Sequence, residues 1–288
     1  MKKRNGRPFV YSTMLTLTIL SFVVAACKDT ANTTSTISEV KDNNHIMDTT
    51  NTIKFKVKNV EFRMVAIEGG TFVMGSNEAN TNKDQKPNHK VTLSDFSIGQ
   101  TEVTQELWQA VMGNNPSEFS GRNLPVDNVT WDECHVFVTR LNGILHENGQ
   151  LAKDKSFHLP SEAQWEFAAK GGNKSKGYTY AGSNDINAVA WTRSNTNKTH
   201  PVASKMPNEL GIYDMSGNVW EWVEDYYAPY RYSDRNDPIN TTDKTTGLVV
   251  KRGGSWYYSQ EERFTPSFRY GYYTHVTDSS IGIRLALS

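Results

Sequence analysis

The chain has 288 residues, and its 31 Lys and Arg residues balance its 31 Asp and Glu residues, so the formal net charge is zero. A neutral chain lacks the basic surplus that binding to nucleic acid or attraction to an acidic membrane surface requires. Aromatic residues make up 11% of the chain and hydrophobic residues only 37%. This composition favours a loop-rich fold held by aromatic clusters over a regular helix bundle.

The N-terminus has the pattern of a bacterial lipoprotein signal peptide. Several basic residues in positions 2–7 precede an apolar run over 9–24, and Val24-Ala25-Ala26-Cys27 resembles the lipobox that is cut before cysteine. We therefore expect a signal peptide at 1–26, lipidation of Cys27, and a lipid-anchored protein at the outer membrane or cell surface. The alternative is a single membrane-spanning helix, although the apolar run is short for a bilayer.

After Cys27 the sequence predicts a tether and then one folded domain. Residues 27–52 are mostly Thr, Asn, Asp, Ser and Lys, which is typical of a flexible segment. From Ile53 to Val65 apolar and polar residues alternate as in strands, and Gly69-Gly70 marks a turn. Since neither a fixed-period repeat nor a linker divides residues 53–288, we predict one α+β domain.

Three helices are predicted from capping residues and apolar spacing: 104–112, 131–146 and 161–170. Thr104, Thr130 and Ser161 each place a hydroxyl at the expected N-cap, with acidic residues in the first turn. Cys134 falls on the apolar face of the second helix. With Cys27 lipidated it has no intramolecular disulfide partner, so we expect a buried structural thiol.

Seven separated blocks resemble those of the formylglycine-generating-enzyme (sulfatase-modifying-factor) family, in the same order. They are Ile67-Glu68-Gly69-Gly70-Thr71-Phe72-Val73-Met74-Gly75-Ser76, Thr101-Glu102-Val103-Thr104, Pro125-Val126-Asp127-Asn128-Val129-Thr130-Trp131, residues 159–172, residues 208–222, Arg252-Gly253-Gly254-Ser255-Trp256 and Ile281-Gly282-Ile283-Arg284-Leu285-Ala286. The resemblance implies a C-type-lectin-like fold over 53–288, with little regular secondary structure and a small twisted antiparallel sheet.

The residues that carry catalysis in that family are missing here. Its active oxidases bind copper through two cysteines after the Arg-Gly-Gly-Ser-aromatic block, because soft thiolates suit Cu(I). The matching positions are Tyr258 and Arg263. A second enzymatic branch binds iron through three histidines, mainly from an additional helical domain that has no room here, and no histidine pair in this chain has helical metal-ligand spacing. We therefore predict no catalytic residue and no enzyme activity.

The resemblance also implies a structural calcium ion, although no cofactor is required. Its ligands would be the side chains of Asp214 and Glu221 and the backbone carbonyls of Gly217 and Val219, which are oxygen donors suited to a hard cation. The alternative is a buried Trp-rich turn whose acidic side chains accept backbone hydrogen bonds.

The stretch 257–280 is the candidate ligand-binding segment. Its tyrosines stand among small polar residues, as in antibody paratopes, where rigid rings supply contact area and small residues supply adaptable hydrogen bonds. The residues expected to contact a ligand are Trp256, Tyr257, Tyr258, Ser259, Ser267, Tyr270, Gly271, Tyr272, Tyr273, His275, Val276, Asp278 and Ser279. The alternative is that the tyrosines pack a loop-rich core; we expect each ring to be partly buried and the cluster to form an exposed loop surface.

This segment resembles the variable regions of diversity-generating-retroelement proteins, most of all those of the Treponema variable lipoproteins, which are built on the same fold. Those systems randomise adenines, commonly in AAC codons, and an NNC codon cannot encode Lys, Glu, Gln, Met or Trp. None of these five types occurs from Arg263 to Ser280, although they are common elsewhere in the chain. Gln260, Glu261 and Glu262 would have to be fixed positions.

Three functions from different classes remain open at this point. The first is a surface-displayed lipoprotein, diversified in 257–280, that binds a protein or glycan on another cell or host surface, with no nucleic-acid partner. The second is a fixed structural or binding subunit of an envelope assembly. The third is a metal-dependent oxidase or an enzyme with an unrecognised site.

Overall fold

The computed structural model describes residues 51–79, 81–231 and 233–288. The predicted signal peptide, Cys27 and the tether up to residue 50 lie outside the described residues. In the part of the chain that is described, no helix has both the length and the apolar character needed to cross a membrane.

The first two strands form a hairpin. β1 (Thr52–Val57) pairs with β2 (Val60–Ile67) in antiparallel register, with Phe55 opposite Phe62. The two rings stack with centroids 5.5 Å apart, and Phe157 packs edge-on against Phe55. The alternating run from residue 53 to 65 is therefore strand material as predicted, but it contains a turn. Lys58 lies in this turn with φ 54°, a left-handed conformation that is usually adopted by glycine, so the sequence gives no sign of the turn.

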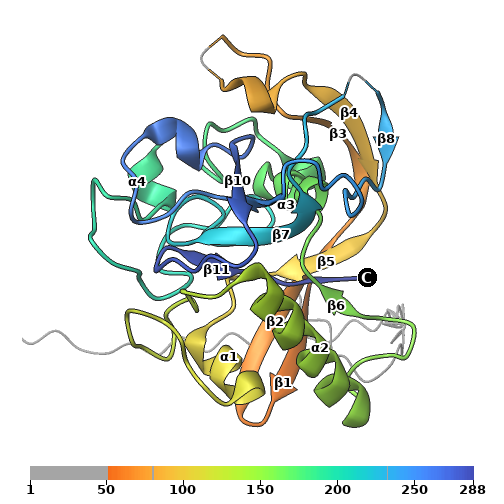
Figure 1. The fold of residues 1–288 in the computed structure, drawn as a ribbon, viewed down its shortest axis with the longest axis vertical. Helices are drawn as coiled ribbons and strands as arrows, with labels where there is room; N and C mark the ends of the chain where they lie inside the picture. Colours follow the sequence, from red (N-terminus) through yellow and green to blue (C-terminus); the bar gives the residue numbers. More distant parts are fainter. Residues whose placement is uncertain (1–50, 80, 232) are drawn as a thin grey trace, which may run out of the picture. The chain divides into compact units, whose positions relative to one another are not determined.

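The strands form three sheets (Figure 1). The five-stranded sheet has the order β1-β2-β5-β12-β6, the four-stranded sheet the order β10-β9-β7-β11, and the three-stranded sheet the order β3-β4-β8. The remaining strands are β3 (Gly70–Met74), β4 (His89–Leu93), β5 (Phe96–Gly99), β6 (Phe157–His158), β7 (Trp220–Tyr226), β8 (Arg235–Asn236), β9 (Leu248–Arg252), β10 (Arg269–Tyr273), β11 (Ile281–Ile283) and β12 (Ala286–Leu287).

The expectation of one small antiparallel sheet is too simple. Two of the pairings, β11 with β7 and β4 with β8, are parallel, and each joins segments that are far apart in the sequence. Parallel pairing needs a long connection between the strands. The long loops that the composition predicts supply these connections.

The three predicted helices are confirmed with their caps. They are α1 (Gln105–Met112), α2 (Trp131–Glu147) and α3 (Glu162–Ala169), preceded by Thr104, Thr130 and Ser161. Each cap hydroxyl accepts a hydrogen bond from a backbone N–H of the first turn, and α2 and α3 carry complete capping boxes. The short helical turns are α4 (Ile186–Val189), η1 (Lys83–Gln85), η2 (Gly172–Lys174) and η3 (Glu261–Phe264).

The cysteine of α2 is fully buried in the main core. In Figure 1, α1 and α2 lie beside the β1–β2 hairpin, where Trp108 and Phe137 stack with ring centroids 4.8 Å apart. Cys134 belongs to the same hydrophobic cluster, and burial raises the pKa of its thiol well above the usual range. The prediction of a buried structural thiol is confirmed, because a thiol without water and with a raised pKa is a poor nucleophile.

A buried ionic network connects α3 to strands β9 and β10. Glu162 forms ion pairs with Arg252 on β9 and with Arg269 on β10, and Arg252 also pairs with Glu166. Although burial alone would raise it, the pKa of Glu166 lies below its ordinary value because Lys170 and Arg252 are adjacent. These side chains are almost completely removed from water, so each charge depends on its partner.

Replacing Arg252 with methionine should therefore destabilise the fold strongly. Arg252→Met leaves Glu166 buried without its guanidinium partner, which costs about 3–5 kcal/mol in other proteins. The measurement is the free energy of unfolding in urea. Arg122→Met is the matched control, since the Arg122 side chain is 80% exposed in its pair with Glu106 and such pairs contribute about 0–1 kcal/mol. Equal losses for the two variants would contradict this account of the network.

Candidate functional site

The candidate ligand-binding segment contains an edge strand. β10 pairs with β9 along Arg269 to Tyr273, with Tyr270 opposite Lys251 and Tyr272 opposite Val249. In the sheet order, β10 stands at the end next to β9. The expectation of a loop across Gly271 is therefore wrong for residues 269–273. The remainder of the segment contains η3 and the connection to β11.

Five tyrosines of this segment form what we call the tyrosine surface: Tyr257, Tyr258, Tyr270, Tyr272 and Tyr273. Tyr257, Tyr270 and Tyr273 are exposed by 56%, 40% and 54%, and the other two are half-buried. The rings of Tyr257 and Tyr258 meet edge to face with centroids 5.4 Å apart. The expectation that the rings are partly buried while the cluster is exposed matches this arrangement.

Two residues expected to contact a ligand lie beneath this surface instead. Trp256 is buried and donates from its indole N–H to the carbonyl of Ser279, at 3.1 Å. Ser267 is buried and donates to the side chain of Gln85, at 3.0 Å. Both side chains are held by internal hydrogen bonds, so we correct their role from ligand contact to support.

The remaining predicted contact residues fall into two groups. Ser259 and His275 are exposed, whereas Val276, Asp278 and Ser279 are half-buried. Asp278 accepts hydrogen bonds from both the backbone N–H and the hydroxyl of Ser280, which fixes the turn into β11. Asp278 therefore has a structural task besides any contact it makes with a ligand.

Gly271 is required by the packing behind β10. A Cβ atom at this position would lie 2.7 Å from the ring of Tyr227. Tyr227 is held in place by its hydroxyl, which donates to the carboxylate of Asp84 at 2.8 Å. The glycine thus lets Tyr227 pack behind the strand. Its assignment as a ligand contact stays a prediction, because Gly271 is half-buried and its backbone is not covered on every side.

Three cations lie against the tyrosine rings, and the sequence reasoning did not find them. Lys251 on β9 places its ammonium nitrogen 4.0 Å from the centroid of Tyr272 and 5.3 Å from that of Tyr270. The guanidinium of Arg263 lies 4.4 Å from Tyr258, and that of Arg193 lies 6.0 Å from Tyr257. The available signal for Lys251 was a lysine inside an otherwise apolar strand, Leu248–Arg252.

The amine of Lys251 has an unusual environment. Only 3% of the residue is exposed, and burial lowers its pKa to about 7, although the carboxylate of Asp278 opposes that shift. Removing an ammonium group from water favours its neutral form. Lys251 therefore exchanges its proton near neutral pH beneath an exposed aromatic surface.

A groove of about 520 Å³ runs beside the edge strand. Its lining residues come from η1, β10 and the segments around them: Asn82, Lys83, Asp84, Tyr227, Leu248, Arg263, Phe268, Arg269, Tyr270 and Gly271. Tyr270 and Arg263 thus belong to both the groove and the cation–tyrosine contacts. We take the groove and the tyrosine surface together as the candidate site, because Tyr270 and Arg263 connect them. Successive residues of a strand point to opposite faces, so Tyr273 lies on the face of Gly271, whereas Tyr270 and Tyr272 lie on the face of Lys251.

The positions that carry copper-binding cysteines in the oxidases belong to this same site. Tyr258 is half-buried, and Arg263 lies over its ring. A phenol and a guanidinium cannot replace two thiolates as ligands for Cu(I). Cys134, the one cysteine among the described residues, is buried in α2.

The predicted calcium ligands surround a buried cluster of charges. Both carboxylate oxygens of Glu221 accept hydrogen bonds from the guanidinium of Arg284, and one also accepts from the indole of Trp165. Glu221 therefore does not fit as a cation ligand, because a guanidinium already neutralises it. Burial raises the pKa of Asp214 to about 6, while its Oδ2 accepts from the backbone N–H of Ala203. Calcium at Asp214 and the carbonyls of Gly217 and Val219 stays a prediction.

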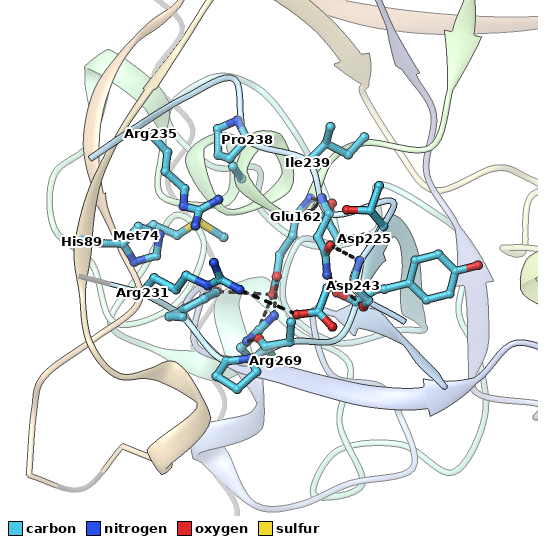
Figure 2. Close-up of a pocket in the computed structure, with 17 residues that line it drawn as sticks. Met74, His89, Glu162, Asp225, Arg231, Arg235, Pro238, Ile239, Asp243 and Arg269 are labelled. Carbon is cyan, nitrogen blue, oxygen red and sulfur yellow. Dashed lines mark hydrogen bonds and ion pairs between the residues drawn. The ribbon is translucent and has the colours of Figure 1, made fainter. Parts of the chain in front are cut away.

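A second pocket, of about 240 Å³, lies over the ionic network (Figure 2). Glu162 and Arg269 pair inside it, and Arg231 is directed toward Asp243 at 4.0 Å. Burial, and then the neighbouring Glu162 carboxylate, raise the pKa of Asp225 to about 7. Asp225 accepts hydrogen bonds from the backbone N–H groups of Glu162 and Asn240, so it holds the pocket wall together.

Comparison with known proteins gives a consistent picture of the fold. The model of the family described as "Sulfatase-modifying factor enzyme 1-like domain" matches residues 50–288. The structure of Treponema denticola variable protein 1 is 34% identical, with a TM-score of 0.71, and the match covers 81% of this chain and 97% of that one. These findings confirm the predicted C-type-lectin-like α+β fold and the family resemblance.

Two curated proteins that are similar to this chain are named for different activities. Chaperone protein LppX of Paenibacillus barcinonensis is 35% identical over 239 residues, which cover 68% of this chain and 79% of that protein. The formylglycine-generating enzyme of Streptomyces coelicolor is 30% identical over 157 residues, 49% of this chain. That match spans only 45% of the enzyme's length.

Substituting alanine for Gly271 should destabilise the fold through the clash with Tyr227. Overpacking of a filled site typically costs about 1–3 kcal/mol, which urea unfolding would measure. Gly143→Ala is the control, because this exposed glycine inside α2 has nothing within 4 Å of its Cβ position. Alanine there should stabilise the helix by about 0.5–1 kcal/mol. Stabilisation by Gly271→Ala as well would show that the close approach to Tyr227 does not constrain β10.

Proposed function

We propose that this chain, which belongs to the sulfatase-modifying factor enzyme 1-like domain family, is a non-enzymatic binding protein that contacts its ligand through the tyrosine surface. The observation that carries the proposal is the exposure of Tyr257, Tyr270 and Tyr273 on and beside an edge strand. Large exposed aromatic side chains that cluster are typical of binding surfaces. At the oxidases' cysteine positions stand Tyr258 and Arg263, which favours binding over catalysis.

We further propose that the surface is diversified by a retroelement. The similarity to a structure named as a variable protein supports this, as does the absence of Lys, Glu, Gln, Met and Trp from Arg263 to Ser280. Such a system requires a surface whose side chains can vary and a framework that stays constant, and in this fold different residues meet the two requirements. Exposed side chains can change freely, whereas Phe264, Phe268 and Arg269 are buried and must stay constant.

The N-terminal sequence supports a lipid anchor on Cys27 and display at the outer membrane or cell surface. The ligand would then be a protein or glycan on another cell or host surface. The second candidate function is a fixed binding subunit of an envelope assembly. It is favoured by the similarity to LppX, which is named as a chaperone.

The comparison of this locus among isolates separates the two candidates. Under diversification, substitutions should concentrate at exposed positions such as Tyr257, Tyr270, Tyr273 and His275, while Phe268 stays unchanged because it fills the core. A nearby copy of the codons for 257–280 that differs only at adenines, beside a reverse-transcriptase gene, is also expected. An invariant segment without such a copy would favour the fixed subunit.

Removing the lipid-attachment thiol should abolish acylation of the protein. When cells are grown with radiolabelled palmitate, the unchanged protein should take up label and Cys27→Ser should not, because the acyl chains attach at that thiol. The matched control is Cys134→Ser, which leaves the anchor in place and should be labelled. An unchanged protein that takes up no label and resists a carbonate wash would instead support the alternative of a spanning helix at 9–24.

A further inference from the structure

The cations of the tyrosine surface form no ion pairs within the described part of the protein. Arg193, Lys251 and Arg263 each contact aromatic rings, and none forms an ion pair with a carboxylate among residues 51–79, 81–231 and 233–288. The buried arginines of the framework behave differently. Arg252, Arg269 and Arg284 are each paired with at least one glutamate.

The acidic groups near the surface are already engaged or stand apart. Asp278 accepts from the N–H and hydroxyl of Ser280, and Glu261 accepts from the hydroxyl of Tyr180 at 3.0 Å. Glu262 is exposed on η3. A cation over a tyrosine face is attracted by the ring, but the ring does not cancel its charge. Asp84, which lines the groove, accepts from the hydroxyl of Tyr227. Since none of these carboxylates forms an ion pair with Lys251, Arg263 or Arg193, the three cations can still attract a carboxylate from outside.

The backbone of the site has the form of a strand-addition site. β10 is the end strand of its sheet, and among the described residues no strand pairs with its other side. An edge strand of this kind offers unpaired N–H and C=O groups, which an extended polypeptide can pair with. The 520 Å³ groove, which Tyr270 and Gly271 help to line, gives room for side chains of such a polypeptide next to this strand. A glycan lacks the alternating backbone N–H and C=O groups that pair with a strand edge.

We propose that the site takes an acidic polypeptide segment, which adds to the edge of β10 and is selected for carboxylates by the charges of Lys251, Arg263 and Arg193. This inference rests on the proposed function, since it names the ligand class of the same surface. Lys251 and Arg193 lie outside 257–280. The preference for acidic partners therefore persists when the tyrosine segment itself is varied.

Lys251 makes the selection depend on pH. The groups that face it are Tyr270 and Tyr272 from β10 and Trp220 from β7, together with the charges of Arg263 and Asp278. Its pKa is lowered by burial to about 7, and a carboxylate placed over the rings raises it again. Binding is then accompanied by proton uptake. Affinity is greatest below pH 7 and falls as the pH rises through the pKa of the bound form.

The test begins with selection of a random 12-residue peptide library on the immobilised full-length protein. Enriched peptides should carry Asp and Glu, and their synthetic Glu→Gln and Asp→Asn counterparts should bind at least about tenfold more weakly, which corresponds to about 1.4 kcal/mol. Tyr270→Ala and Tyr273→Ala should also weaken binding. Val73→Ala is the control, because Val73 is equally exposed but lies on β3 in another sheet.

Substitution at Lys251 tests the charge itself. Lys251→Met should weaken binding of the acidic peptides about tenfold at pH 6.5 and remove its pH dependence. Lys251→Arg should keep the affinity but not the pH dependence, because a guanidinium stays protonated. Calorimetry in two buffers of different ionisation enthalpy reads the proton uptake, which a purely structural role would not change. All of these variants also carry His275→Gln, so that protonation of this exposed histidine does not contribute to the pH dependence. Lys90→Met is the control, at an exposed lysine of β4.

Each outcome of these experiments tests a different part of the proposal. Selection of neutral or basic peptides that still depend on Tyr270 and Tyr273 overturns the charge inference and leaves the proposed function standing. Peptides that bind without these tyrosines overturn the proposed function. If no peptide is enriched but a sulfated oligosaccharide binds and depends on the tyrosines, the polypeptide assignment is overturned.

Discussion

Buried ion pairs between glutamates and arginines are the constraint on which the rest of this structure depends. Glu162 and Glu166 on α3 hold Arg252 of β9 and Arg269 of β10, and Glu221 of β7 holds Arg284 just after β11. The four-stranded sheet thus has side-chain links from three of its strands to a helix or to a following turn. In a chain with few long elements, these links replace much of the order that helix packing would supply. Each buried charge also needs its partner, because an unpaired buried charge lowers the stability of the fold by several kcal/mol.

The network explains how β10 can have a fixed backbone and exposed side chains. Arg269 and Phe268 anchor the beginning of β10 from below, and Gly271 lets Tyr227 pack against its middle. Tyr270, Tyr272 and Tyr273 then emerge from a backbone whose position does not depend on their own side chains. A surface built in this way tolerates substitution at the tyrosines, since the free energy that holds the strand comes from residues beneath it.

What the sequence alone predicts well is the local part of this arrangement. The N-caps at Thr104, Thr130 and Ser161 need only residues within the first helical turn, and all three helices begin where predicted. The exposure of the tyrosine cluster also follows from composition, because a short polar stretch has few apolar residues to bury. The family blocks extend this reading to the fold, which the matches to residues 50–288 and to the Treponema structure confirm.

The parts that could not be predicted are those set by pairing between distant segments. Gly271 looks like a break in any strand until Tyr227 is known to pack against it, so the sequence predicts a loop where residues 269–273 form a strand. Trp256 and Ser267 look like contact residues until their hydrogen bonds to Ser279 and Gln85 are seen. Lys251 gains its importance only from the register that sets it opposite Tyr270.

Register also decides the chemistry of the surface. Because Lys251 lies under rings from two neighbouring strands, its ammonium group loses water without forming an ion pair, and the attraction of Asp278 offsets only part of that loss. A lysine in that position weakens the fold when it is charged, and the same desolvation is what makes it sensitive to a ligand's charge. The framework pairs the buried cations Arg252, Arg269 and Arg284 with glutamates. The free-energy cost of a buried, unpaired cation therefore falls at Lys251, where the charge of a bound ligand can reduce it.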